Sequence, residues 1–160
     1  MEDVIDAIVA ELTEFKDTTA ANGGCSDILT IEAVYWGDPG IIPVNSYPAF
    51  LVQPIRDIPD IETTGYEVRD LEVLVTCLID SRSYWDATAL EATGDRALTQ
   101  VMERVRNWFR TDTNRHLQGL DGTREVRATN TDYMVQVRGS VVAKSAQVTL
   151  TVNKQRERVA

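Results

Sequence analysis

The sequence predicts a single α+β domain in which an antiparallel or mixed β-sheet sandwich is flanked on one side by two α-helices. Three observations predict it. The chain has 160 residues, 43% of them apolar, which suffices for one domain with a buried core. Two stretches repeat apolar residues at helical spacing, and several others alternate like strands. Their order, α-β-β-β-α-β-β-β, favours antiparallel strands with both helices on one face.

The first predicted helix covers residues 2–17 and has an acidic, amphipathic pattern. Asp3 is the expected N-cap, and Asp6 stands in the first turn, where the helix dipole favours a carboxylate. The helix is expected to end before the polar, glycine-rich segment 18–24, which is a loop by composition. Its apolar face is formed by Val4, Ile5, Ile8, Leu12 and Phe15.

Three strands are predicted next. The first, 28–36, stops at a Gly-Asp-Pro-Gly turn. The second, 49–53, lies between Pro48 and Pro54, and prolines mark strand ends or a sheet edge. The third, 66–80, is apolar on both sides, which predicts a cover on both faces. We expect the helix layer on one face and a neighbouring subunit on the other.

An apolar stripe several turns long predicts the second helix. Thr88 and Glu91 have the spacing of a capping box at its start, and Gly94 is expected to break or bend the segment. Three arginines in its last turns complement the helix dipole. The stripe is formed by Ala97, Leu98, Val101, Met102, Val105, Trp108 and Phe109.

Three more strands are predicted after the second helix, at 123–131, 133–142 and 146–152. The last of them alternates valine or leucine with threonine, which is typical of a half-buried strand. The domain is therefore expected to span residues 1–153. Residues 154–160 are charged and are expected to form a frayed tail.

The charge is unevenly distributed along the chain. The net charge is -9, which disfavours nonspecific binding to nucleic acid. Residues 1–80 hold 16 acidic and three basic side chains, whereas residues 81–160 hold nine acidic and 13 basic ones. The halves either neutralise each other within the fold or dock an acidic face on the basic face of a neighbour. No secretory signal and no membrane-spanning run are predicted.

The sequence offers little that could carry chemistry. His116 is the one histidine and has no partner at ligand spacing, so we expect it to be exposed to solvent. Cys25 and Cys77 do not form a CxxC pair and are expected to be free thiols in a reducing cytoplasm. No glycine-rich phosphate-binding motif occurs. We therefore expect no catalytic residue, no cofactor and no metal ion.

Protein interfaces are the sites that the sequence favours. The segment 55–65 is polar and is expected to be an extended, mobile hairpin loop; we interpret its carboxylates as a solvated acidic cluster rather than a cation site. Most aromatic residues, Trp36 among them, are expected in the core, whereas one pair between a strand and a helix is expected to be exposed for contact. The candidate interface residues are Asp57, Asp60, Glu62, Tyr84, Trp85, Arg124 and Arg127.

The chain resembles the tail terminator and tail-completion proteins of long-tailed bacteriophages, from about Val4 to Val152. The resemblance rests on the acidic first helix, the long strand 71–79, the amphipathic helix 96–110 and the late strand 148–152. Its local signatures are Tyr35-Trp36-Gly37-Asp38-Pro39 and Tyr47-Pro48-Ala49-Phe50-Leu51-Val52.

The resemblance implies a virion protein at the head–tail junction, assembled in the host cytoplasm. Such subunits form a ring, usually sixfold, that caps the tail tube, stops its polymerisation and meets the head connector. Their sheets line the channel, their helices lie outside, and DNA passes without specific binding. An acidic inner wall would repel DNA, and basic lumen-facing residues would contradict this hypothesis. The acidic segment 57–65 is not a family signature.

Other classes remain open from the sequence. A head-completion or stopper protein would form another ring at the same junction. A secretion-type chaperone would be an acidic, cytoplasmic α+β dimer. A small enzyme would need a pocket with paired titrating groups.

Overall fold

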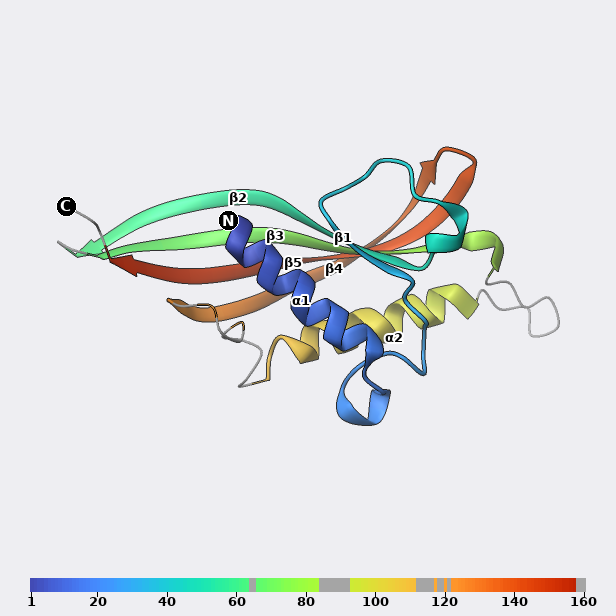
Figure 1. Ribbon diagram of the computed structural model, residues 1–160, viewed down its shortest axis with the longest axis horizontal. Coiled ribbons are helices and arrows are strands. Elements are labelled where there is room, and N and C mark those ends of the chain that lie inside the picture. Colours follow the sequence, from blue (N-terminus) through green and yellow to red (C-terminus); the bar gives the residue numbers. More distant parts are fainter. Residues whose placement is uncertain (64–65, 84–92, 112–116, 118–119, 121, 158–160) are drawn as a thin grey trace.

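The computed structural model describes residues 1–63, 66–83, 93–111, 117, 120 and 122–157. Figure 1 shows a long twisted sheet with two helices packed against it. The elements are α1 (Glu2–Asp17), η1 (Ala20–Asn22), β1 (Ala33–Trp36), η2 (Val44–Ser46), β2 (Ala49–Thr63), β3 (Tyr66–Asp80), η3 (Ser81–Ser83), α2 (Thr93–Trp108), β4 (Thr123–Arg138) and β5 (Val141–Glu157).

The described strands form one five-stranded sheet in the order β1-β2-β3-β5-β4. β1 pairs with β2 in parallel, and every other neighbouring pair is antiparallel. The α+β class and the mixed sheet are therefore confirmed. The sandwich is not, because the described part of the chain holds a single sheet.

The order of elements is α-β-β-β-α-β-β, with one strand fewer than the sequence predicted. The segment 123–131 and residues 133–138 form the single strand β4; the chain then turns at Gly139, a glycine with φ 61°, and residues 141–142 already belong to β5. The predicted gap between strands 133–142 and 146–152 does not exist, because Lys144 and Ser145 lie inside β5. Ser145 is buried, and its hydroxyl accepts a hydrogen bond from Gln136 Nε2 at 3.2 Å, so it fits the strand. β5 continues to Glu157, past the predicted boundary at residue 153.

The predicted loop 55–65 is mostly strand. β2 runs on to Thr63 and pairs with β3 as a hairpin, with Asp57 opposite Leu71. Pro54 marked the end of the predicted strand 49–53, but no described strand lies along the outer side of β2 beyond β1, and a sheet edge tolerates a residue without an N–H.

Both helices lie on one face of the sheet, as predicted (Figure 1). Their apolar stripes meet the odd-numbered residues of β3 and the even-numbered residues of β5, and burial of each large side chain contributes about 1.5–3 kcal/mol. This core includes Ile8, Leu12, Phe15, Phe50, Val73, Val75, Leu98, Met102, Val105, Val148 and Leu150.

The helix starts differ in detail from the prediction. Asp3 is not the N-cap, because α1 begins at Glu2 and its N-cap is Met1. The Asp3 carboxylate instead pairs with Lys154 of β5 and with the terminal amine. Gly94 does not break α2, which is continuous from Thr93. The proposed Thr88–Glu91 capping box lies outside the described residues.

A second apolar cluster covers one end of the opposite sheet face. The chain's own segment 37–48 folds over it, so Leu78 of β3 is buried without a neighbouring subunit. Arg138 fastens this segment: its guanidinium donates to both carboxylate oxygens of Asp38, at 2.6 and 2.9 Å, and to the Gly40 carbonyl at 3.0 Å. The cluster consists of Ile42, Tyr47, Leu51, Leu78, Val141 and Ala143.

Candidate assembly surfaces

The rest of this second sheet face has no covering layer among the described residues, and it is mostly polar, with Ile58 and Met134 as exposed apolar side chains. Strand alternation and the pairing register assign side chains to it. Threonine, glutamine and asparagine dominate the middle, where Thr149 and Thr151 stand on β5. The described residues of this open face include Gln53, Arg56, Asp70, Glu72, Leu74, Glu125, Arg127, Asp132, Gln147, Thr149, Thr151 and Asn153.

The charges on the open face are largely paired with one another. Arg56 Nε lies 3.5 Å from a Glu72 carboxylate oxygen, and an Arg127 nitrogen lies 3.0 Å from Glu125. Asn153 donates to Asp70 at 2.8 Å. Two arginines stand against four carboxylates, which leaves this described surface with a net charge of -2. It is therefore not a surface that attracts a phosphate backbone.

The acidic interface candidates lie on the outer half of β2. Asp57 accepts from Arg69 at 3.1 Å, and Arg69 also donates to Glu67 at 2.9 Å, so a local ion pair partly satisfies the acidic segment. Asp60 and Glu62 lie further along the same strand, but their side chains are outside the described part.

The basic candidates lie on the other edge of the sheet. Arg124 and Arg127 are near the start of β4, and only the side chain of Arg127 is described. The register aligns Arg127 with Thr151, Glu72 and Arg56 across four strands, one position from Asp57. The structure thus separates the acidic and basic candidates onto opposite edges at the same end of the sheet. Tyr84 and Trp85 lie outside the described residues.

A further surface, which sequence reasoning missed, lies at the other end of both edges. Trp36 on β1 was expected in the core but is 51% exposed. On β4, Tyr133, Val135 and Val137 are all exposed, the last to 74%. They lie on the helix side of the sheet, where the start of α2 reaches Tyr133 and Val135 but leaves both side chains exposed. Only the short length of the second helix relative to these strands could have signalled this.

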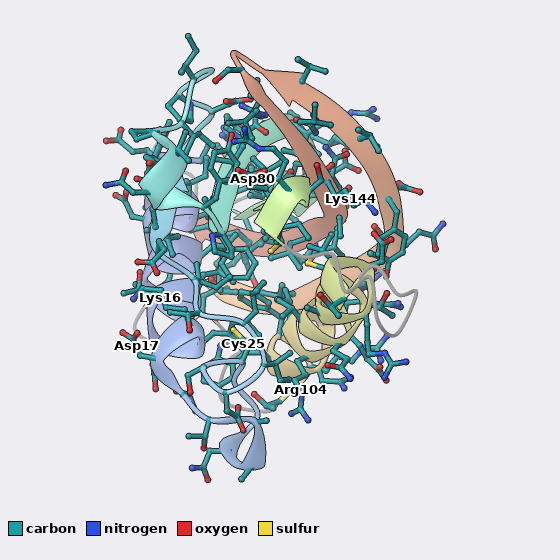
Figure 2. All side chains as sticks on the ribbon, turned by 90° about the vertical axis from the view of Figure 1, so that its right-hand side faces the viewer. Lys16, Asp17, Cys25, Asp80, Arg104 and Lys144 are labelled. Carbon is teal, nitrogen blue, oxygen red and sulfur yellow. The ribbon has the colours of Figure 1, made fainter. Side chains whose placement is uncertain are left out.

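The buried polar groups lie in the helix core rather than on these surfaces. Trp108 Nε1 donates to the Glu11 carboxylate at 3.1 Å, and burial raises the pKa of Glu11. Burial also raises the pKa of Cys25 to about 12 and raises the pKa of Cys77. Both thiols are free and buried, and Figure 2 places Cys25 between the two helices. Such thiols are poor nucleophiles and poor metal ligands.

No cluster of three or more metal-binding side chains occurs among the described residues. His116 lies outside them. A depression of about 410 Å³ lies beside η1 and α2, where Arg104 Nη1 donates to the Ala20 carbonyl at 2.8 Å. Its lining contains no hydroxyl, thiol or imidazole: Ala20, Ile28, Gln100, Glu103, Arg104 and Asn107.

Neither of the two described helices is long and apolar enough to cross a bilayer. No protein-family model matches the chain, and no curated protein matches it.

Proposed function

We propose that this chain is a structural virion subunit that forms a ring at the end of a bacteriophage tail tube, stops tube polymerisation and joins the tail to the head connector. One observation carries the proposal: a single sheet with a helix layer on one face and a polar, internally ion-paired face left open on the other. Its partners are other copies of itself, the tail tube protein and the connector or stopper protein.

The layering suits a channel wall. With the helices outside, the open sheet face would line the lumen, and its short polar side chains would present no free arginine cluster to passing DNA. Binding of DNA is dominated by contacts between cations and phosphates, so a wall with paired charges lets the genome slide. An open face with a net positive charge would contradict this; Arg56 and Arg127 are each ion-paired, and the described side chains of this face give a net charge of -2.

The two edges of the sheet favour a ring over a closed dimer. An interface that uses one surface twice closes after two copies, whereas two different, complementary surfaces produce a ring or a filament. Here one edge carries the acidic segment of β2 and the other carries Arg124 and Arg127. A head-to-tail contact joins opposite charges, whereas a contact between like edges repeats them.

The test has two stages. Native mass measured across a concentration series should show a cyclic species, with a hexamer expected. Purified tail tubes, mixed with the chain and imaged by negative stain, should carry it at one end and stop growing. A stable dimer at every concentration would overturn the proposal in favour of the chaperone class. Rings that ignore tubes but bind DNA-filled heads would assign the stopper role instead.

A further inference from the structure

The sheet has two free edges, and they differ along their length. On one side β1 is the outermost strand for four residues, and beyond it the outer half of β2 is exposed. On the other side no described strand pairs with the outer edge of β4. A free edge presents unpaired N–H and C=O groups, and most proteins blunt such edges with proline or charge.

On the β1 side only β1 is suited to pairing with another strand, and on the β4 side a register shift between Ala128 and Thr131 divides the strand into two stretches. The outer half of β2 contains Pro54 and Pro59, which cannot donate to a ladder. The segment of β4 from Thr131 to Arg138 has neither proline nor glycine, and neither has β1. Both therefore keep the full set of backbone donors that edge pairing needs.

These two stretches match each other in position. The register links Val34 of β1 through Phe50, Cys77 and Ala146 to Tyr133 of β4, so both lie in one row. The same series of cross-strand pairings links Trp36 of β1 to Thr131 of β4. β1 and β4 also run antiparallel, as follows from the intervening pairs. A second copy placed next to the first in the plane of the sheet therefore brings its β1 beside β4 of the first copy, and the two strands are antiparallel.

They match in chemistry as well. Val34 and Trp36 point to the helix side of the sheet, and so do Tyr133, Val135 and Val137. Side-by-side edges would bury these apolar groups against each other as cross-strand pairs, each worth about 0.2–1 kcal/mol beyond its burial.

We infer that β1 of one copy pairs antiparallel with the Thr131–Arg138 half of β4 of the next copy, and that this junction repeats around a ring. The occupant of the free β4 edge is thus a second copy of this chain. The inference deepens the proposed function and rests on it for the closure of a ring.

The opposite end of the junction is held by charge rather than by backbone pairing. Where β1 ends, one strand is missing between β2 and the neighbour's β4, which leaves a gap of about 10 Å between the backbones. Arginine and carboxylate side chains are long enough to bridge it. In these rows Arg127 of β4 lies opposite Arg56 and one position from Asp57 of β2, so Asp57 is the described carboxylate that Arg127 can reach diagonally across the gap.

The geometry also gives a size. Five strands at about 4.8 Å cover about 24 Å, so six copies joined edge to edge enclose a wall about 45 Å across between backbones. Duplex DNA fits through such a channel.

Disulfide trapping tests the junction. Val34→Cys and Tyr133→Cys are made singly and together in the full chain, whose native thiols are buried and unreactive. Under mild oxidation the double variant should give a ladder of covalent oligomers that ends at the ring. A mixture of the two single variants should give only covalent dimers. Thr131→Cys and Val135→Cys, each combined with Val34→Cys, cover a register shift of two residues.

The possible outcomes distinguish failure of the inferred β1–β4 junction from failure of the proposed function. Rings that form without any cross-link at these positions overturn the junction and leave the ring intact. Dimers of Tyr133→Cys alone would show β4 pairing with itself, which also overturns it. Cross-linked rings that do not cap tail tubes would support the junction and refute the proposed function. A chain that stays monomeric and uncross-linked at its solubility limit would overturn the inference.

Discussion

At the residue scale, a few polar contacts fix segments that the apolar core does not reach. The Arg138–Asp38 pair is the clearest, since it ties the segment 37–48 to the β4–β5 hairpin by a two-pronged contact. The hydrogen bonds from Arg138 hold the pKa of Asp38 below its usual range. A charged group in such a geometry contributes more than an exposed ion pair does.

Replacing Asp38 by Asn should lower the free energy of unfolding by about 1–3 kcal/mol at pH 7, because hydrogen bonds to a charged partner are lost. In the native chain, a lowered folded pKa means that this stability is present above the unfolded pKa of about 3.9 and is lost as the pH falls through the folded value. Urea unfolding between pH 2 and pH 7 measures both effects. Asp17→Asn is the control, since its ion pair with Lys16 is exposed; an equal loss there would contradict the assignment.

Glu11 has the opposite pH dependence. Burial raises its pKa, so stability from this group is complete below the unfolded pKa of about 4.3 and decreases as the pH rises through the folded value. Glu11→Gln keeps an acceptor for Trp108 and removes the buried charge, so its stability should match or exceed the native value at pH 7. Glu11→Ala should lose about 1–3 kcal/mol, because an indole donor loses its partner. Equal losses in thermal unfolding of the two variants would refute this account.

At the element scale, β3 shows what the sequence could and could not predict. Its double-sided apolar pattern predicted a cover on both faces, and the helical stripes correctly identified both helices and their shared face. The cover over Leu78 was assigned to a neighbour, whereas the chain's own segment supplies it. A pattern of apolar residues reports that a face is buried, not which segment buries it.

The same limit explains the strands that were misplaced. Asp57, Pro59 and their neighbours have low strand propensity, but pairing with β3 outweighs it at a sheet edge. The acidic and basic candidates were identified one by one, yet their positions on opposite edges depend on the strand order, which local patterns do not encode. The exposed apolar end of β4 was missed for the same reason.

β3 also carries a buried hydroxyl with no hydrogen-bond partner within the described structure. Thr76 is 1% exposed, and its Oγ1 is unsatisfied. Thr76→Val keeps the branched shape that a strand prefers and removes this polar atom. The variant should unfold at a higher urea concentration, with a gain of about 1 kcal/mol. Thr99→Val on α2 is the control, because the Thr99 hydroxyl donates to the Asp95 carbonyl at 2.8 Å and no gain is expected there. A loss of stability in Thr76→Val would mean that the hydroxyl is satisfied in solution.

At the scale of the whole molecule, both edges of the sheet are suited to pairing with strands of other copies. Most of its helix face is covered by the chain itself, and its second face is mostly polar apart from the end beneath segment 37–48. At the two edges, apolar side chains meet solvent beside backbone groups that no described strand pairs. An exposed edge of this kind is an aggregation hazard unless a partner occupies it. A ring removes both edges at once, which a dimer through one edge does not.

If the β4 edge pairs with another copy, a single charged side chain placed on that edge should stop assembly without unfolding the chain. Val135 is 64% exposed on β4, so Val135→Lys should leave the folded monomer nearly as stable, within about 0.5 kcal/mol, as is usual for a surface substitution. A lysine at a sheet edge is a device that proteins use against edge pairing, so the variant should remain monomeric where the native chain forms rings. Native mass and thermal unfolding measure the two properties separately.

Val44→Lys is the matched control for this substitution. Val44 is exposed to a similar extent, 57%, but lies in η2, away from both sheet edges. It should assemble like the native chain, because no edge carries the new charge. If Val135→Lys also forms rings at native concentrations, β4 does not take part in the contact between copies. If both variants fail to assemble, the interface extends over segment 37–48, and the edges alone do not define it.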